Sequence, residues 1–174
     1  IGYASRESFL LADQGASEGI PKKETAYEQV QYAALFEAGN NPDAWKVVLE
    51  HPELEPWSSH ARQILGMYYL QDDEYKQALP FFEQLADMPD VHREPKARGL
   101  AGQVVIFAIQ NDSRLPDTII ALLKLADKPP PLRNILGPEL SQQVTEVLTK
   151  QANQVGESAR SVIEDLLKQL SPPR

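Results

Sequence analysis

Residues 64–86 read ILGMYYLQDDEYKQALPFFEQLA, and this stretch decides the fold of the 174-residue chain. It contains two segments of helical apolar spacing on either side of a polar turn at Asp72 and Asp73. Side chains three or four positions apart lie on one face of a helix. The positions that fit this spacing are Leu65, Tyr69, Tyr75, Ala78 and Phe82. We therefore predict a helical hairpin whose two helices meet along these side chains.

This hairpin resembles a tetratricopeptide repeat, a helix–turn–helix unit of about 34 residues. The resemblance is carried by Leu65, Gly66, Tyr69, Tyr75, Ala78 and Phe82. Gly66 and Ala78 are small where the two helices of such a unit approach closely, and the aromatic positions fill the space beside them. Arg62 and Leu85 depart from the repeat pattern, which has Trp and Ala there. The resemblance implies antiparallel hairpins stacked as a short right-handed superhelix.

A second helix pair is predicted before this hairpin. Its first helix begins at Glu24 and ends at Gly39-Asn40, where Gly suits a left-handed cap. The predicted apolar face of this helix consists of Tyr27, Val30, Ala34 and Ala38. The next helix extends from Pro42 to about His51, with Asn41 as its N-cap.

The central hairpin has two further predicted features. Ser58 or Ser59 is expected to cap its first helix. Pro80 lies well inside its second helix, predicted from Asp73 to Met88, and we expect the helix to continue with a local bend.

The sequence pattern of the C-terminal half predicts further helices, separated by turns that contain proline. Pro95 opens a helix with a broad apolar stripe made of Leu100, Ala101, Val104, Val105 and Ala108. A turn at 111–116 precedes a helix that starts at Asp117 or Thr118, and 128–133 is expected to be an extended polyproline spacer. Two helices follow, from Pro138 to about Asn153 and from Glu157 to Leu170, the last of them a capping helix.

Taken together, the patterns predict an all-α fold of about eight helices. We expect residues 1–23 to form an N-terminal arm or linker, 24–171 a single repeat domain, and 172–174 a tail. A domain of this length can bury a sizeable core.

The charge is uneven along this acidic chain. The net charge of the whole chain is −8, whereas residues 24–94 contain 14 Asp and Glu against 4 Lys and Arg. Surfaces that bind phosphate need the opposite sign, so the composition argues against nucleic acid as a partner. An acidic half is either an ordinary solvated surface or one that attracts basic partners.

The sequence contains neither cysteine nor a membrane-spanning pattern. Because the chain has no cysteine, disulfides and thiolate metal sites are excluded. The sequence also lacks a run of about 18 apolar residues, the pattern that predicts a membrane-spanning helix. The chain starts at Ile1 without Met, and we expect a longer protein from which any anchor was removed. The compartment stays open: cytoplasmic, or periplasmic or otherwise extracytoplasmic if an upstream anchor existed.

Catalytic and metal-binding patterns are weak. The three histidines, His51, His60 and His92, are far apart in sequence and lack helical ligand spacing. Residues 15–19 match G-x-S-x-G by letters but lack the strand–turn–helix context of a nucleophile elbow. Asn111-Asp112-Ser113 matches a glycosylation acceptor, a frequent chance triplet. We therefore expect a non-enzymatic protein without a metal or cofactor.

Stacked hairpins leave a concave surface lined by their first helices, and such surfaces bind peptides or partner helices. The repeat resemblance implies that the groove positions are His60, Gln63, Met67, Leu70, Gln71, Arg98 and Val105. The sequence thus favours a protein–protein interaction scaffold. The alternatives are that neighbouring segments cover these positions, or that the chain is a structural or homo-oligomerising module of a larger membrane-tethered envelope protein.

Overall fold

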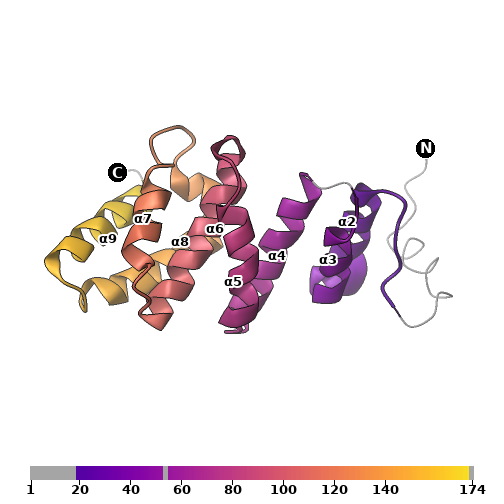
Figure 1. Ribbon diagram of the computed structural model, residues 1–174, viewed down its shortest axis with the longest axis horizontal. Coiled ribbons are helices and arrows are strands. Elements are labelled where there is room, and N and C mark those ends of the chain that lie inside the picture. The colour runs from indigo at the N-terminus through magenta and orange to yellow at the C-terminus, as the bar shows by residue number, and fades with distance from the viewer. Residues whose placement is uncertain (1–18, 53–54, 173–174) are drawn as a thin grey trace.

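The computed structural model describes residues 19–52 and 55–172. This part of the chain forms eight α-helices, two short 3₁₀ helices and no strand, which confirms the predicted all-α fold of about eight helices. The elements are α2 (Ala26–Leu35), η1 (Phe36–Gly39), α3 (Pro42–Leu49), α4 (Trp57–Gln71), α5 (Tyr75–Ala86), η2 (Asp90–His92), α6 (Arg93–Gln110), α7 (Leu115–Leu123), α8 (Leu132–Ala152) and α9 (Glu157–Leu170). From α2 to α6 they follow chain order along the long axis of the molecule, and α7, α8 and α9 gather at the other end, with α8 beside α6 (Figure 1).

Local signals set several helix ends as predicted. The side chain of Asn41 accepts hydrogen bonds from the amides of Asp43 and Ala44, and Pro42 occupies the first turn of α3. Gly39 has the left-handed conformation predicted for it, with φ +81, but it ends η1. The helix predicted to reach Gly39-Asn40 is wrong at its end: α2 stops at Leu35, and Glu37 and Ala38 have positive φ. α9 has the predicted bounds. The motif at 15–19 and most of the predicted N-terminal arm lie outside the described residues.

The predicted apolar face of α2 is wrong in part. Tyr27 is 51% exposed, and Ala34 and Ala38 are also exposed, whereas Val30 is buried. The face that packs inward consists of Ala26, Gln29, Val30, Tyr32 and Ala33. Gln29 is buried because its side chain bonds to the segment before α2, accepting from the Lys23 amide and donating to the Pro21 carbonyl. A polar residue with two backbone partners therefore occupies a core position that apolar periodicity cannot identify.

Other predicted boundaries also need correction. α6 begins at Arg93, two residues before Pro95, which was predicted to open it. α4 begins at Trp57 without a side-chain cap, since the Ser58 and Ser59 hydroxyls bond instead to Glu55 and to the Pro56 carbonyl. α7 begins at Leu115, before the predicted start at Asp117 or Thr118. The predicted spacer at 128–133 ends early, because α8 begins at Leu132 and is interrupted at Gly137, where φ is +77. As predicted, α5 continues through Pro80, which is exposed.

The centre of the core is the ring of Phe82, which is 0% exposed. It lies between glycines of two other helices, Gly66 of α4 and Gly102 of α6. A Cβ atom at Gly66 would lie 2.9 Å from the ring, and one at Gly102 would lie closer still. Gly99 brings α6 against the α5 backbone, where a Cβ atom would lie 2.6 Å from the Phe82 carbonyl oxygen. Absent side chains thus allow α4, α5 and α6 to approach closely.

Arg93 fixes the connection between α7 and α8. Its guanidinium donates to the Leu125 carbonyl at 2.5 and 2.8 Å, to the Pro130 carbonyl at 3.0 Å and to the Lys128 carbonyl. These carbonyls follow the end of α7, where they lack helical partners. One side chain of α6 therefore holds the path of the Pro-containing loop.

We predict that Gly102→Ala lowers the free energy of unfolding by about 1–3 kcal/mol, because the added methyl group must displace the fully buried Phe82 ring. Gly156→Ala is the matched control, since nothing lies within 4 Å of its Cβ position. Denaturant unfolding followed by circular dichroism compares the two variants. Equal stability of both variants would contradict the packing described for Phe82.

Arg93→Ala is expected to cost about 1.5–3 kcal/mol of stability, the usual contribution of hydrogen bonds to a charged group. Arg93→Lys keeps the charge but lacks the planar fork that reaches several carbonyls, so it should recover only part of this loss. Thermal unfolding of the three proteins measures the effect. Full recovery by lysine would mean that charge, not geometry, is what the loop requires.

Candidate functional site

The predicted groove positions line two separate clefts. His60, Gln63 and Arg98 line one, and Leu70, Gln71 and Val105 line the other. Met67 lines neither and packs against the core. Two residues of α8 bond to side chains that line these clefts. The Ile135 carbonyl accepts from Arg98 at 2.8 Å, and Glu139 accepts from Gln71. Neighbouring helices thus cover part of the surface that the repeat resemblance implies.

The first cleft, called the His60 cleft, has a volume of about 500 Å³. It is lined by Glu55, Pro56, Ser59, His60, Gln63, His92, Glu94, Pro95 and Arg98. Arg98 already donates to Gln63 at 2.6 Å and pairs with Glu94 at 2.8 Å, besides its bond to α8. Its donors are engaged within the fold, so we regard this cleft as the weaker candidate for a ligand.

His60 has an environment that disfavours its charged form. Its ring packs edge-on against Trp45, with centroids 5.6 Å apart. Although the residue remains partly exposed, partial desolvation of its ring lowers the pKa of His60 below the usual 6.5, and the positive charge of Arg98 lowers it further. His60 is therefore neutral near pH 7.

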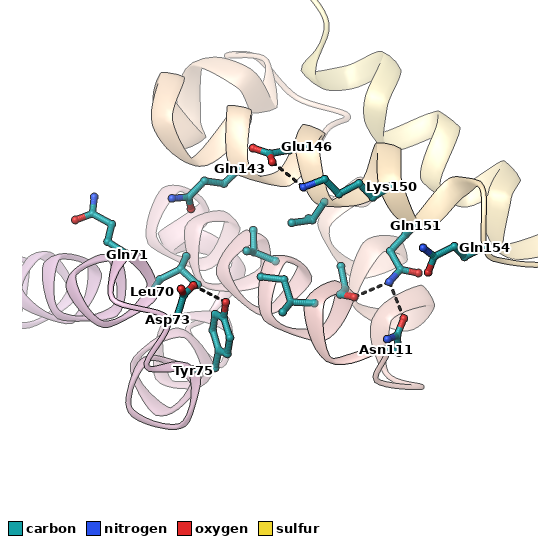
Figure 2. A pocket seen from close by; sticks show the side chains of 14 residues that line it. Leu70, Gln71, Asp73, Tyr75, Asn111, Gln143, Glu146, Lys150, Gln151 and Gln154 are labelled. Carbon is teal, nitrogen blue, oxygen red and sulfur yellow. Dashed lines mark hydrogen bonds and ion pairs between the residues drawn. The ribbon is translucent and has the colours of Figure 1, made fainter.

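The second cleft, called the α6–α8 cleft, has a volume of about 580 Å³. Its apolar floor consists of Leu70, Val105, Ala108, Ile109 and Val147. Figure 2 shows side chains of α8, from Gln143 to Gln151, and of Gln154 in the following turn on one side, and those of the α4–α5 hairpin on the other. Ile109 is 42% exposed, whereas Leu70 and Val105 are 5% and 3% exposed. Ile109 is thus the main apolar side chain that a ligand could contact.

Carboxamide side chains surround this floor. They are Gln71, Asn111, Gln143, Gln151 and Gln154. The buried Oε1 atom of Gln143 accepts no hydrogen bond from any described residue. Gln151 donates to the Ala108 carbonyl at 2.6 Å and to Asn111 Oδ1 at 2.8 Å (Figure 2). Gln143 therefore keeps an unused acceptor, while Gln151 joins α8 to the end of α6.

Charged groups lie at the two sides of the α6–α8 cleft. Asp73 accepts a hydrogen bond from the Tyr75 hydroxyl at 2.6 Å, which raises the pKa of Tyr75 to about 12. Glu146 pairs with Lys150 at 2.8 Å, and this pairing lowers the pKa of Glu146. Tyr75 is neutral near pH 7, and the carboxylate of Asp73 contributes negative charge to the side formed by the hairpin.

The sequence reading missed the α8 wall of this cleft. Gln143, Glu146 and Lys150 recur every three or four positions, and this spacing places polar side chains along one face of the helix, beside Gln151 and before Gln154 in the turn that follows. The signal was present, but a polar helical stripe usually faces solvent. Only the packing of α8 against α6 brings that stripe beside Ile109.

The described residues contain no group of three or more His, Asp or Glu side chains placed to hold a metal ion. Nor does any helix in this part of the chain combine the length and apolar character needed to cross a membrane. Comparison with models of known protein families finds no match, and comparisons with curated proteins and with solved structures find no significant match either.

The pKa of His60 predicts an acid-sensitive contribution to stability. The unfolded chain binds a proton at this residue near pH 6.5, whereas the folded chain resists protonation. The free energy of unfolding should therefore fall as pH decreases from 6.5 towards the lower folded pKa. Urea unfolding at several pH values is expected to show a shallower fall for His60→Gln. Parallel curves for the two proteins would show that the surroundings of His60 do not lower its pKa.

Proposed function

We propose that this chain is a non-enzymatic protein–protein interaction scaffold that binds a polypeptide segment in the α6–α8 cleft. The observation that carries the proposal is the set of carboxamides around an apolar floor. A carboxamide both donates and accepts hydrogen bonds, as a peptide backbone does. Such a surface can pair with main-chain N–H and C=O groups while the floor receives apolar side chains.

The unused acceptor of Gln143 supports this proposal. A buried polar atom without a partner costs free energy, and an incoming backbone N–H group would remove that cost. The exposed part of Ile109 lies in the same cleft, so a ligand can gain apolar contact and a hydrogen bond together. A ligand that offers both groups along its length is a polypeptide.

The resemblance of the α4–α5 hairpin to a tetratricopeptide repeat is consistent with a binding scaffold, and we propose a TPR-like right-handed stack as its architecture. In such repeats the first helices of successive hairpins carry the binding surface. Leu70 and Gln71 of α4 and Val105 of α6 line the α6–α8 cleft. The partner surface proposed here also includes α8 and the α4–α5 turn.

The charge of the chain favours a basic partner. Residues 24–94 have a net charge of −10, and the turn between α4 and α5 contains Asp72, Asp73 and Glu74. Exposed carboxylates attract basic proteins and raise their rates of association at low salt.

Ile109→Glu is expected to weaken binding of a protein partner about tenfold or more, because it places a charge on the apolar floor. Ile120→Glu is the matched control: Ile120 is 41% exposed but does not line the cleft. Partners captured by the immobilised chain are identified, purified and measured by titration calorimetry against each variant. Leu70 is unsuitable for this test because it is buried in the core.

Light scattering provides the second part of this experiment. A concentration-independent monomer whose partner is lost with Ile109→Glu and kept with Ile120→Glu supports the scaffold. Equal effects of the two substitutions would exclude the α6–α8 cleft as the binding site. A stable dimer that captures no partner would favour the structural or oligomerising module instead.

A further inference from the structure

A smaller pocket adjoins the α6–α8 cleft. Its volume is about 250 Å³, and its apolar wall consists of Leu115, Ile119, Val155, Ala159 and Ile163. We name it the α7–α9 pocket, since most of these residues belong to α7 and α9. Asn111, Gln151 and Gln154 line both the pocket and the cleft, so the two cavities share one boundary.

The size of the α7–α9 pocket restricts what it can hold. Sites for whole small molecules usually have volumes of about 300–1,000 Å³, and this pocket falls below that range. One side chain that extends from a ligand in the larger cleft is a better match. The apolar wall favours an aliphatic or aromatic side chain.

The charged groups at the rim of the pocket neutralise each other. Asp112 accepts hydrogen bonds from the Arg114 guanidinium at 2.8 and 3.0 Å and from the Arg114 amide at 2.9 Å. These bonds hold the pKa of Asp112 at about 2, and the guanidinium also lies over the Phe107 ring at 4.2 Å. Because the charges already pair, the pocket offers none to a ligand, which again favours an uncharged side chain.

The boundary between the two cavities is held in place. Both Nε2 hydrogens of Gln151 are used, one by the Ala108 carbonyl and one by Asn111. Its Oε1 atom has no hydrogen-bond partner among the described residues, so it can accept a hydrogen bond from a backbone that passes over it. The main chain of a polypeptide that crosses this boundary would hydrogen-bond to the carboxamide side chains, and one of its side chains would enter the pocket.

The opposite end of the α6–α8 cleft has a different character. Asp73 lines the cleft there, and its neighbours Asp72 and Glu74 are also exposed carboxylates. A basic side chain of the ligand complements this end, whereas an acidic one would be repelled.

We propose that the ligand of the α6–α8 cleft is an extended, basic polypeptide segment that inserts one apolar side chain into the α7–α9 pocket and places a Lys or Arg beside the Asp72–Glu74 turn. This inference rests on the proposed function, because it requires that the cleft binds a polypeptide. It also specifies two residues of the partner: an apolar one that the α7–α9 pocket binds and a basic one that lies beside the Asp72–Glu74 turn.

A random-peptide library displayed on phage, selected on the full chain, tests this inference. Enriched peptides should share one apolar residue and at least one basic residue. A synthetic peptide carrying the shared residues is then titrated by fluorescence anisotropy against the wild type, Ile109→Glu, Ala159→Met and Val155→Thr. Ala159→Met fills the pocket, while Val155→Thr makes its wall polar at nearly constant volume. Circular dichroism checks that each variant is folded.

Replacing the apolar residue of the peptide with Ala should weaken binding to the wild type about tenfold or more. The same replacement should have little effect with Ala159→Met, because the pocket is already occupied. Val155→Thr should weaken the unmodified peptide in the same direction as Ala159→Met.

The outcomes separate the inference from the proposed function. Peptides that lose affinity with Ile109→Glu but bind Ala159→Met and Val155→Thr as they bind the wild type would overturn the pocket inference and leave the scaffold proposal standing. Enriched peptides rich in Asp and Glu would overturn the predicted basic ligand. If no sequence is enriched, or if Ile109→Glu leaves binding unchanged, the proposed function fails together with the inference.

Discussion

The packing of Phe82 between Gly66 and Gly102 is the constraint on which the rest of the structure depends. A fully buried aromatic ring contributes several kcal/mol to stability, and here it does so only because two other helices present no side chain where it lies. That contact sets α6 against the α4–α5 hairpin. α6 in turn positions α8 through Arg98 and Ile135 and through Gln151 and Ala108. The α6–α8 cleft therefore exists because three helices approach closely around one ring.

Local chemistry made much of the fold predictable. Asn41 and Pro42 define a helix start by themselves, and the spacing of apolar residues from Glu157 to Leu170 sufficed for α9. The errors occurred where distant contacts compete with local rules. Ser58 bonds to Glu55 instead of capping α4. Gln29 is buried because the Pro21 carbonyl and the Lys23 amide are its hydrogen-bond partners. The periodicity of apolar residues cannot indicate such bonds.

The candidate site was less predictable than the fold. The repeat resemblance pointed to first-helix positions, and Leu70, Gln71 and Val105 do line the α6–α8 cleft. It could not indicate that α8 lies beside them, since the polar face of α8 that includes Gln143 and Glu146 has the pattern of a solvent-exposed surface. The separation into two clefts likewise depends on Arg98, whose bonds to Gln63, Glu94 and Ile135 are visible only in three dimensions. The sequence indicates which side chains are polar, but not which residues of other helices they contact.

Site-specific photocrosslinking in native cells tests the central claim most directly, namely that a protein partner occupies the α6–α8 cleft. A photoreactive phenylalanine analogue replaces Gln143 at the wall of the cleft in one variant and Ile120, outside it, in another. We expect a discrete adduct with another protein from position 143 and none from position 120. Adducts of equal yield from both positions, or an adduct from position 120 alone, would contradict it.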